Sequence, residues 1–349
     1  MKPIILLATC LFLLISIPKI ANADAILSSV EQKYKADDPA LFEKYLVANS
    51  LISLPGKHPA NLEQANVELT EILESDLNFA PAYVAYARFL LDTGFVLDQI
   101  ITSVHNRLYA KDTVNNAETA ILQALKLEPR YADAYLLLGY IYQYKNLFID
   151  ARMALQNADR LGSKSPWLYL FYATLMEREK KWPAARLLFD VVLSSETTDR
   201  SAIHFALFGY ASSYKFTGDY EKADKLYQQA IEHEPTVYHL NSYCSFLVFQ
   251  KADFKRAVEI GERSLGLSSA KYTKQILGMA LYARWAEVSR SLDDSEAPAL
   301  FERANEVFPE ILTAMGELGR FEVTRSVSYI IADKVDEIIA QSRKEGKKM

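Results

Sequence analysis

Five histidines and two cysteines are the residues best suited to metal binding or nucleophilic chemistry in this 349-residue chain. No histidine pairs with another at the i,i+4 spacing of an HExxH helix, whereas zinc needs three or four placed ligands. The sequence also has no glycine-rich phosphate loop and no GxSxG nucleophile turn. We therefore expect no catalytic residue, no metal site and no cofactor. The histidines are His58, His105, His204, His233 and His239.

The remaining candidates for chemistry are carboxylates and one thiol. Glu177, Glu179, Glu221 and Asp224 stand at positions that we expect to face solvent, and nothing marks two of them as an acid–base pair. Cys244 lies among apolar residues, which predicts a small core residue rather than a nucleophile. The sequence therefore indicates that the protein is not an enzyme.

The first 23 residues have the pattern of a cleaved signal peptide. A positive start, Met1-Lys2, precedes an apolar run from Ile4 to Ile17, and Ala21-Asn22-Ala23 gives the small-x-small cleavage pattern. The run is shorter than the ~20 residues of a membrane-spanning helix. We expect export to the periplasm or secretion, with no membrane span after cleavage and a mature charge of 37 − 44 = −7.

Composition favours a helical protein with a large core. Glycine and proline number only 12 each, which disfavours a chain of many short strands and tight turns. The aromatic residues comprise 21 Tyr, 17 Phe and 3 Trp, enough for extensive burial. Because the formal net charge is −5, a nucleic-acid partner is not expected.

A period of about 34 residues organises the chain. A small residue is followed by a bulky one four positions later and a small or aliphatic one three positions after that, which places all three on one helical face. The intervals from Ala117 through Ala151, Ala185 and Ala223 to Ala257 are 34, 34, 38 and 34 residues. The triplets are Ala65/Leu69/Ile72, Ala117/Ile121/Ala124, Ala151/Leu155/Ala158, Ala185/Phe189/Val192, Ala223/Tyr227/Ala230 and Ala297/Phe301/Ala304.

With this register, the sequence resembles the tetratricopeptide repeat (TPR) family. The helix end at 124–129 (ALKLEP) and the turn at 217–223 (TGDYEKA) add to the resemblance. It implies an all-α fold, an α-solenoid of stacked helix–turn–helix pairs that forms a right-handed superhelix. We expect the solenoid over 60–311, with a helical insert at 95–113, after an N-terminal capping region at 24–59. Residues 312–349 are expected to form a last helix near 321–343 and a charged tail.

In the resembling family, the first helix of each pair lines a concave groove that binds a peptide. Transfer of this register predicts an aromatic groove for a protein or peptide partner. Some of these aromatic residues are expected to belong to the core between repeats instead. The predicted groove residues are Arg88, Tyr140, Tyr144, Trp167, Arg178, Phe205, Phe208, Lys215, Phe216, Phe246, Phe249, Tyr272 and Tyr282.

The leading hypothesis is a periplasmic interaction module that serves envelope assembly, secretion or polysaccharide export. Two alternatives stay open from the sequence. One is an enzyme or carbohydrate-binding accessory protein with a site on the 95–113 insert. The other is a solenoid that assembles with copies of itself.

Overall fold

The computed structural model describes residues 27–53, 59–100, 104–289 and 294–309, and the secondary structure of these ranges consists of helices joined by turns, without a strand. The predicted signal peptide and the predicted last helix near 321–343 lie outside them. The helices are α1 Ser29–Asp37, α2 Pro39–Ser53, α3 Pro59–Ser75, α4 Ala80–Ile100, α5 Val104–Leu127, α6 Ala132–Tyr144, α7 Phe148–Arg160, α8 Pro166–Arg178, α9 Trp182–Leu193, α10 Arg200–Thr217, α11 Tyr220–His233, α12 Val237–Phe246, the π-helix η1 Leu247–Lys251, α13 Phe254–Leu267, α14 Lys271–Val288 and α15 Ala297–Val307.

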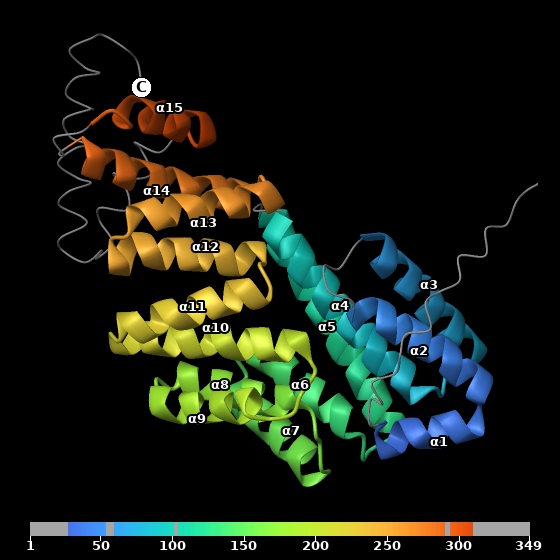
Figure 1. Cartoon of the computed structure of the whole chain (residues 1–349). Helices are drawn as coiled ribbons and strands as arrows, with labels where there is room; N and C mark the ends of the chain where they lie inside the picture. Colours follow the sequence, from blue (N-terminus) through green and yellow to red (C-terminus); the bar gives the residue numbers. More distant parts are fainter. Residues whose placement is uncertain (1–26, 54–58, 101–103, 290–293, 310–349) are drawn as a thin grey trace, which may run out of the picture.

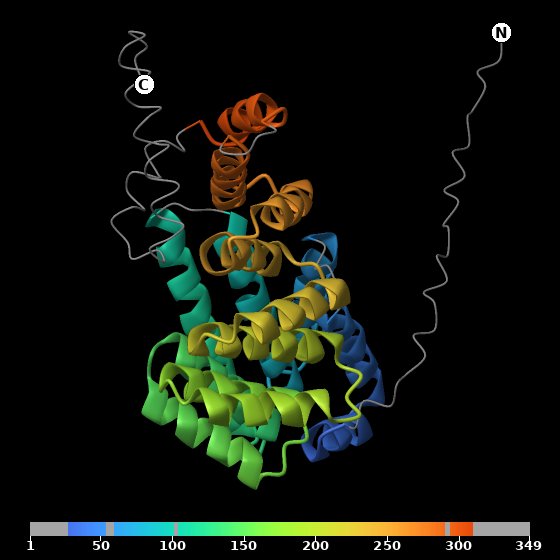
Figure 2. The same cartoon turned by 60° about the vertical axis from the view of Figure 1, so that its left-hand side comes forward.

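The helices stack as antiparallel pairs (Figures 1 and 2). Within the described ranges α2 packs on α3, α4 on α5, and so on to α14 on α15, which makes seven pairs. The first helices of successive pairs also contact one another, as α4, α6, α8 and α10 do in turn. The predicted all-α solenoid is therefore confirmed.

The repeated triplets contribute to the core of six of the seven described pairs, the exception being α12–α13. Ala151, Leu155 and Ala158 of α7 are fully buried, and Leu155 fills the space beside Gly139 of α6. A Cβ atom at Gly139 would lie 2.5 Å from Leu155 Cδ2, so only glycine lets the two helices approach this closely.

The turn at 217–223 shows how a pair is closed. Gly218 ends α10 with a φ of 82°, a left-handed conformation that glycine adopts at little cost. Asp219 then caps α11, because its carboxylate accepts the backbone N–H of Lys222 at 3.3 Å.

The predicted insert belongs to the second pair. Residues 95–100 continue α4 and residues 104–113 form the start of α5, so that both helices are longer than their neighbours. In both views the far end of this hairpin reaches the level of α12 and α13 (Figures 1 and 2).

The N-terminal region contains two helices. α1 begins with a capping box, in which Ser28 and Glu31 bond to each other's backbone N–H groups. The second of these helices, α2, lies within the predicted capping region at 24–59 and packs on both α3 and α4. It is thus a member of the stack, so the pairing of helices begins before residue 60.

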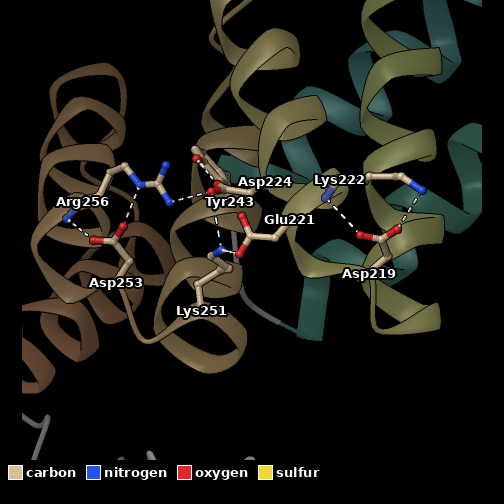
Figure 3. A network of polar contacts seen from close by, with 8 residues as sticks. All are labelled: Asp219, Glu221, Lys222, Asp224, Tyr243, Lys251, Asp253 and Arg256. Atoms are coloured by element: carbon tan, nitrogen blue, oxygen red, sulfur yellow. Dashed lines mark hydrogen bonds and ion pairs between the residues drawn. The ribbon is translucent and has the colours of Figure 1, made fainter.

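A polar network joins the fifth and sixth pairs (Figure 3). Asp224 of α11 accepts hydrogen bonds from Tyr243 Oη at 2.6 Å and Arg256 Nη2 at 2.8 Å. Lys251 contacts Glu221 and lies 4.0 Å from Asp224. Asp224 is only 7% exposed, which corrects the expectation that it faces solvent. A buried carboxylate is stable here because charged donors surround it.

Cys244 is a core residue, as predicted. It is fully buried, and its thiol donates a hydrogen bond to the Ala257 carbonyl at 3.1 Å. Burial raises the pKa of the thiol to about 12, which keeps it protonated and unreactive. None of the described helices combines the length and apolar character needed to span a bilayer.

Candidate partner-binding face

Three successive first helices present matching positions to one face. Equivalent side chains are 34 residues apart between α6 and α8, and 38 residues apart between α8 and α10. These are the intervals between the buried alanines of the helices that pair with them. We call these five rows the aromatic face. The rows are Asp133/Trp167/Phe205, Leu136/Leu170/Phe208, Tyr140/Thr174/Ser212, Gln143/Glu177/Lys215 and Tyr144/Arg178/Phe216.

Aromatic rings form a ladder along the aromatic face from α6 to α10, with the buried core residue Phe171 as one of its members. Tyr140 stacks on Phe171 at 4.9 Å between ring centroids, and Trp167 lies 5.7 Å from both Phe171 and Phe205. Trp167 Nε1 donates to Asp199 Oδ2 at 2.8 Å, which fixes the indole ring. Tyr140, Trp167 and Phe205 are half-buried, because each also packs against a core cluster between repeats.

A second run of rings joins α10 to α12. Phe208 lies 4.1 Å from the ring of His239 and 5.7 Å from that of Tyr238, measured between centroids. Phe208 and His239 are half-buried, while Tyr238 is 47% exposed. The structure thus shows two runs of rings that share α10, one from α6 through α8 to Phe205 and one from Phe208 to α12.

The row at the edge of the face is the most accessible one. Tyr144 is 49% exposed and Phe216 is 60% exposed. Phe216 stacks on Trp182 with centroids 4.9 Å apart. Arg178 is exposed between them and donates to Asn146 Oδ1 at 3.2 Å. Tyr272 of α14, another predicted groove residue, is 51% exposed.

Two predicted groove residues, Phe246 and Tyr282, belong to the core. Phe246 is 1% exposed and packs against Tyr227, and Tyr282 is 2% exposed and donates to Asn305 Oδ1 of α15 at 2.8 Å. Phe246 thus faces α11, the second helix of the preceding pair, and Tyr282 faces α15, the second helix of its own pair.

The other two predicted residues lie away from the ladder. Arg88 of α4 is half-buried, and its Nη1 donates to Asn49 Oδ1 of α2 at 3.0 Å. Phe249 is half-buried in η1, where it packs against the core of the last pairs. They occupy first helices, but the structure does not join them to the five rows.

Glu177 and Lys215 occupy equivalent positions of α8 and α10 in the aromatic face, and the charge of each affects the pKa of the other. Glu177 was expected to face solvent, yet its Oε1 atom is buried and makes no hydrogen bond with any residue of the described ranges. Burial raises the pKa of Glu177 to about 7, although the Lys215 charge opposes this. Burial likewise lowers the pKa of Lys215. The ammonium group lies over the Phe216 ring, with Nζ 4.7 Å from its centroid.

A histidine contact is the main feature that the sequence analysis missed. His204 Nδ1 donates to the Ala230 carbonyl at 3.0 Å, so that Nε2 is left to accept from His239 Nδ1. Burial and the neighbouring His204 lower the pKa of His239 to about 3. The two histidines are 35 residues apart, which is about one repeat, and this spacing was the signal in the sequence that could have predicted their contact. Over the described residues, no three His, Cys, Asp or Glu side chains are grouped for metal binding.

Comparison with known proteins supports the repeat assignment. A tetratricopeptide repeat family model matches residues 206–236, which span α10 and α11. Comparison with curated proteins gives no match.

Solved structures match over a longer range. A chain of the APC/C hetero-tetramer Cut9-Hcn1 aligns with a TM-score of 0.52 and 15% identity, covering 72% of this chain and 51% of the other. Human IFIT1, in its dimer with m7Gppp-AAAA, aligns with a TM-score of 0.54 and 14% identity, covering 84% and 68%. The chain thus spans about half the length of the Cut9-Hcn1 chain. At these identities the likeness concerns the fold, and together with the family-model match it supports a tetratricopeptide-type interaction scaffold.

Proposed function

We propose that this chain is a non-enzymatic periplasmic scaffold that binds a peptide segment of another protein on its aromatic face. The half-buried and exposed rings of the two runs, from α6 to α10 and from α10 to α12, carry the proposal. Rigid aromatic side chains provide large contact area at a modest loss of conformational entropy, and they are frequent at binding hot spots.

A random dodecapeptide display library screened against the full chain tests this function. Peptides should be enriched, and their affinity should fall about tenfold or more when Tyr144→Ala and Phe216→Ala are combined, because both rings are accessible on the face. Tyr169→Ala is the matched control, since Tyr169 is a 40% exposed ring of α8 outside the five rows. Equal loss in the control, or no enriched peptide, contradicts the proposal.

The signal-peptide pattern at 1–23 supports the proposed location. A periplasmic extract should contain a mature chain that begins at Asp24, as measured by intact-mass spectrometry. A photo-crosslinking residue at position 216 in such cells would identify the partner, which we propose acts in envelope assembly, secretion or polysaccharide export. Recovery of the full-length chain from the cytoplasm alone would contradict this location.

A further inference from the structure

One row of the aromatic face, Gln143/Glu177/Lys215, contains two charged side chains: Glu177 Oε1 is buried without a hydrogen bond to a described residue, and Lys215 Nζ lies over the Phe216 ring. Gln143 stands first in this row and is satisfied, because its Nε2 donates to the Phe171 carbonyl at 3.0 Å and its Oε1 accepts from Thr174. Glu177 and Lys215 follow one repeat apart, and neither makes a hydrogen bond or ion pair with a described residue. The charge of each group nevertheless affects the pKa of the other.

Such an arrangement is costly unless something completes it. A carboxylate oxygen that is buried without a hydrogen bond has lost its hydration without compensation. The Tyr227 hydroxyl of α11 is also fully buried, is affected by the Glu177 charge and makes no hydrogen bond with the described residues. Two buried oxygen atoms without a hydrogen bond in the described ranges, one from α8 and one from α11, and the Lys215 ammonium of α10 point to recognition of a polar ligand group.

The chemistry of that group follows from the pair. The Glu177 carboxylate accepts hydrogen bonds and, when protonated, can also donate one, whereas the Lys215 ammonium only donates. A trans peptide unit carries its N–H and its C=O on opposite edges, so it fits between an acceptor and a donor that are held apart. The adjacent rings of Phe208, Phe216 and Trp182 suit apolar side chains on either side of that unit.

We propose that Glu177 and Lys215 bind one backbone amide of an extended, apolar peptide segment, with Glu177 accepting its N–H and Lys215 donating to its C=O. This rests on the proposed peptide-binding function and states which group of the peptide is recognised. Backbone recognition by a fixed pair gives affinity for many sequences, while the neighbouring rings select apolar residues.

The test uses dodecapeptides enriched on the full chain and resynthesised with a single N-methyl group at each position in turn. One N-methylation should weaken binding about tenfold, since it removes one charge-assisted hydrogen bond. In Glu177→Leu the same methylation should change affinity less than twofold, and Lys215→Met should itself weaken binding about tenfold. Glu179→Gln combined with Lys181→Met removes an exposed ion pair at the end of α8 and serves as control.

The outcomes separate the two proposals. If peptides bind and lose affinity in the Tyr144→Ala/Phe216→Ala chain but not in Glu177→Leu or Lys215→Met, the amide contact is overturned while the proposed function stands. If no peptide binds, both fail. Circular dichroism and thermal melting check that the variants fold. Should they not fold, an N-methyl scan on the unmodified chain without a sensitive position still overturns the amide contact.

Discussion

The histidine contact between α10 and α12 is a residue-scale feature with a pH-dependent consequence. His204 and His239 are hydrogen-bonded as neutral rings where the run from Phe208 reaches α12. Burial lowers the pKa of His239 to about 3, whereas a histidine of an unfolded chain titrates near 6.5. Below about pH 6.5 this histidine therefore binds a proton in the unfolded chain but not in the folded chain, so the free energy of unfolding falls as the pH falls.

We predict that the free energy of unfolding decreases between pH 7 and pH 5 by about 2 kcal/mol more in the wild-type chain than in His239→Gln. Urea titrations at the two pH values measure this difference. Glu177, with a pKa raised to about 7, and Asp133, with a pKa raised to about 6, act in the opposite direction. They are present in both proteins, so the comparison isolates His239. Equal losses in the two proteins would contradict the buried neutral pair.

At the scale of elements, close approach between neighbouring helices decides where glycine is required. Gly209 of α10 faces the fully buried ring of Phe189 in α9, and a Cβ atom there would lie 2.4 Å from Phe189 Cζ. Gly266 near the end of α13 has nothing within 4 Å of such an atom. The two glycines therefore differ in packing while both lie in helices.

We predict that Gly209→Ala destabilises the fold by about 1–3 kcal/mol, because the buried ring must shift and the overpacking outweighs the better helix propensity of alanine. Gly266→Ala should be neutral or stabilising by up to about 1 kcal/mol. Chemical denaturation of both variants measures the difference. Similar effects of the two changes would show that the α9–α10 contact is not tight.

Helix pairing could be predicted from the sequence, but the contacts of two first-helix residues could not. The triplets of small and bulky residues mark the buried face because helical periodicity is local. Phe246 was misplaced because it packs against Tyr227 of α11, and the helical pattern within α12 does not specify that contact. Tyr282 was misplaced because it packs against α15, where its hydroxyl donates to Asn305 Oδ1, and the pattern within α14 does not specify that contact.

For the whole molecule, stability is distributed along the stack. Separate core clusters lie between the pairs, one built on α2–α4 and a larger one over α10–α15. Each pair contacts mainly its neighbours, so the free energy is close to a sum of local and nearest-neighbour contributions. Damage to one end should therefore stay local.

We predict that Phe42→Ala, which empties a fully buried site in α2, costs about 3–5 kcal/mol locally. Hydrogen exchange followed by mass spectrometry should show faster exchange in α1, α2 and α3, with α10 to α14 unchanged. Exchange that accelerates equally over the whole chain would mean that the solenoid unfolds as a single cooperative unit.

The sequence by itself determined the helix pairs, their period and the buried triplets, because these depend on residues three or four apart within a helix. Only the tertiary structure decided which side chains from neighbouring repeats meet. His204 and His239, or Glu177 and Lys215, stand a repeat apart, and their approach depends on how successive first helices are packed. The same packing left Phe216 exposed and buried Asp224 beneath Arg256 and Tyr243, since neighbours, not residue type, determine how much of a side chain water can reach.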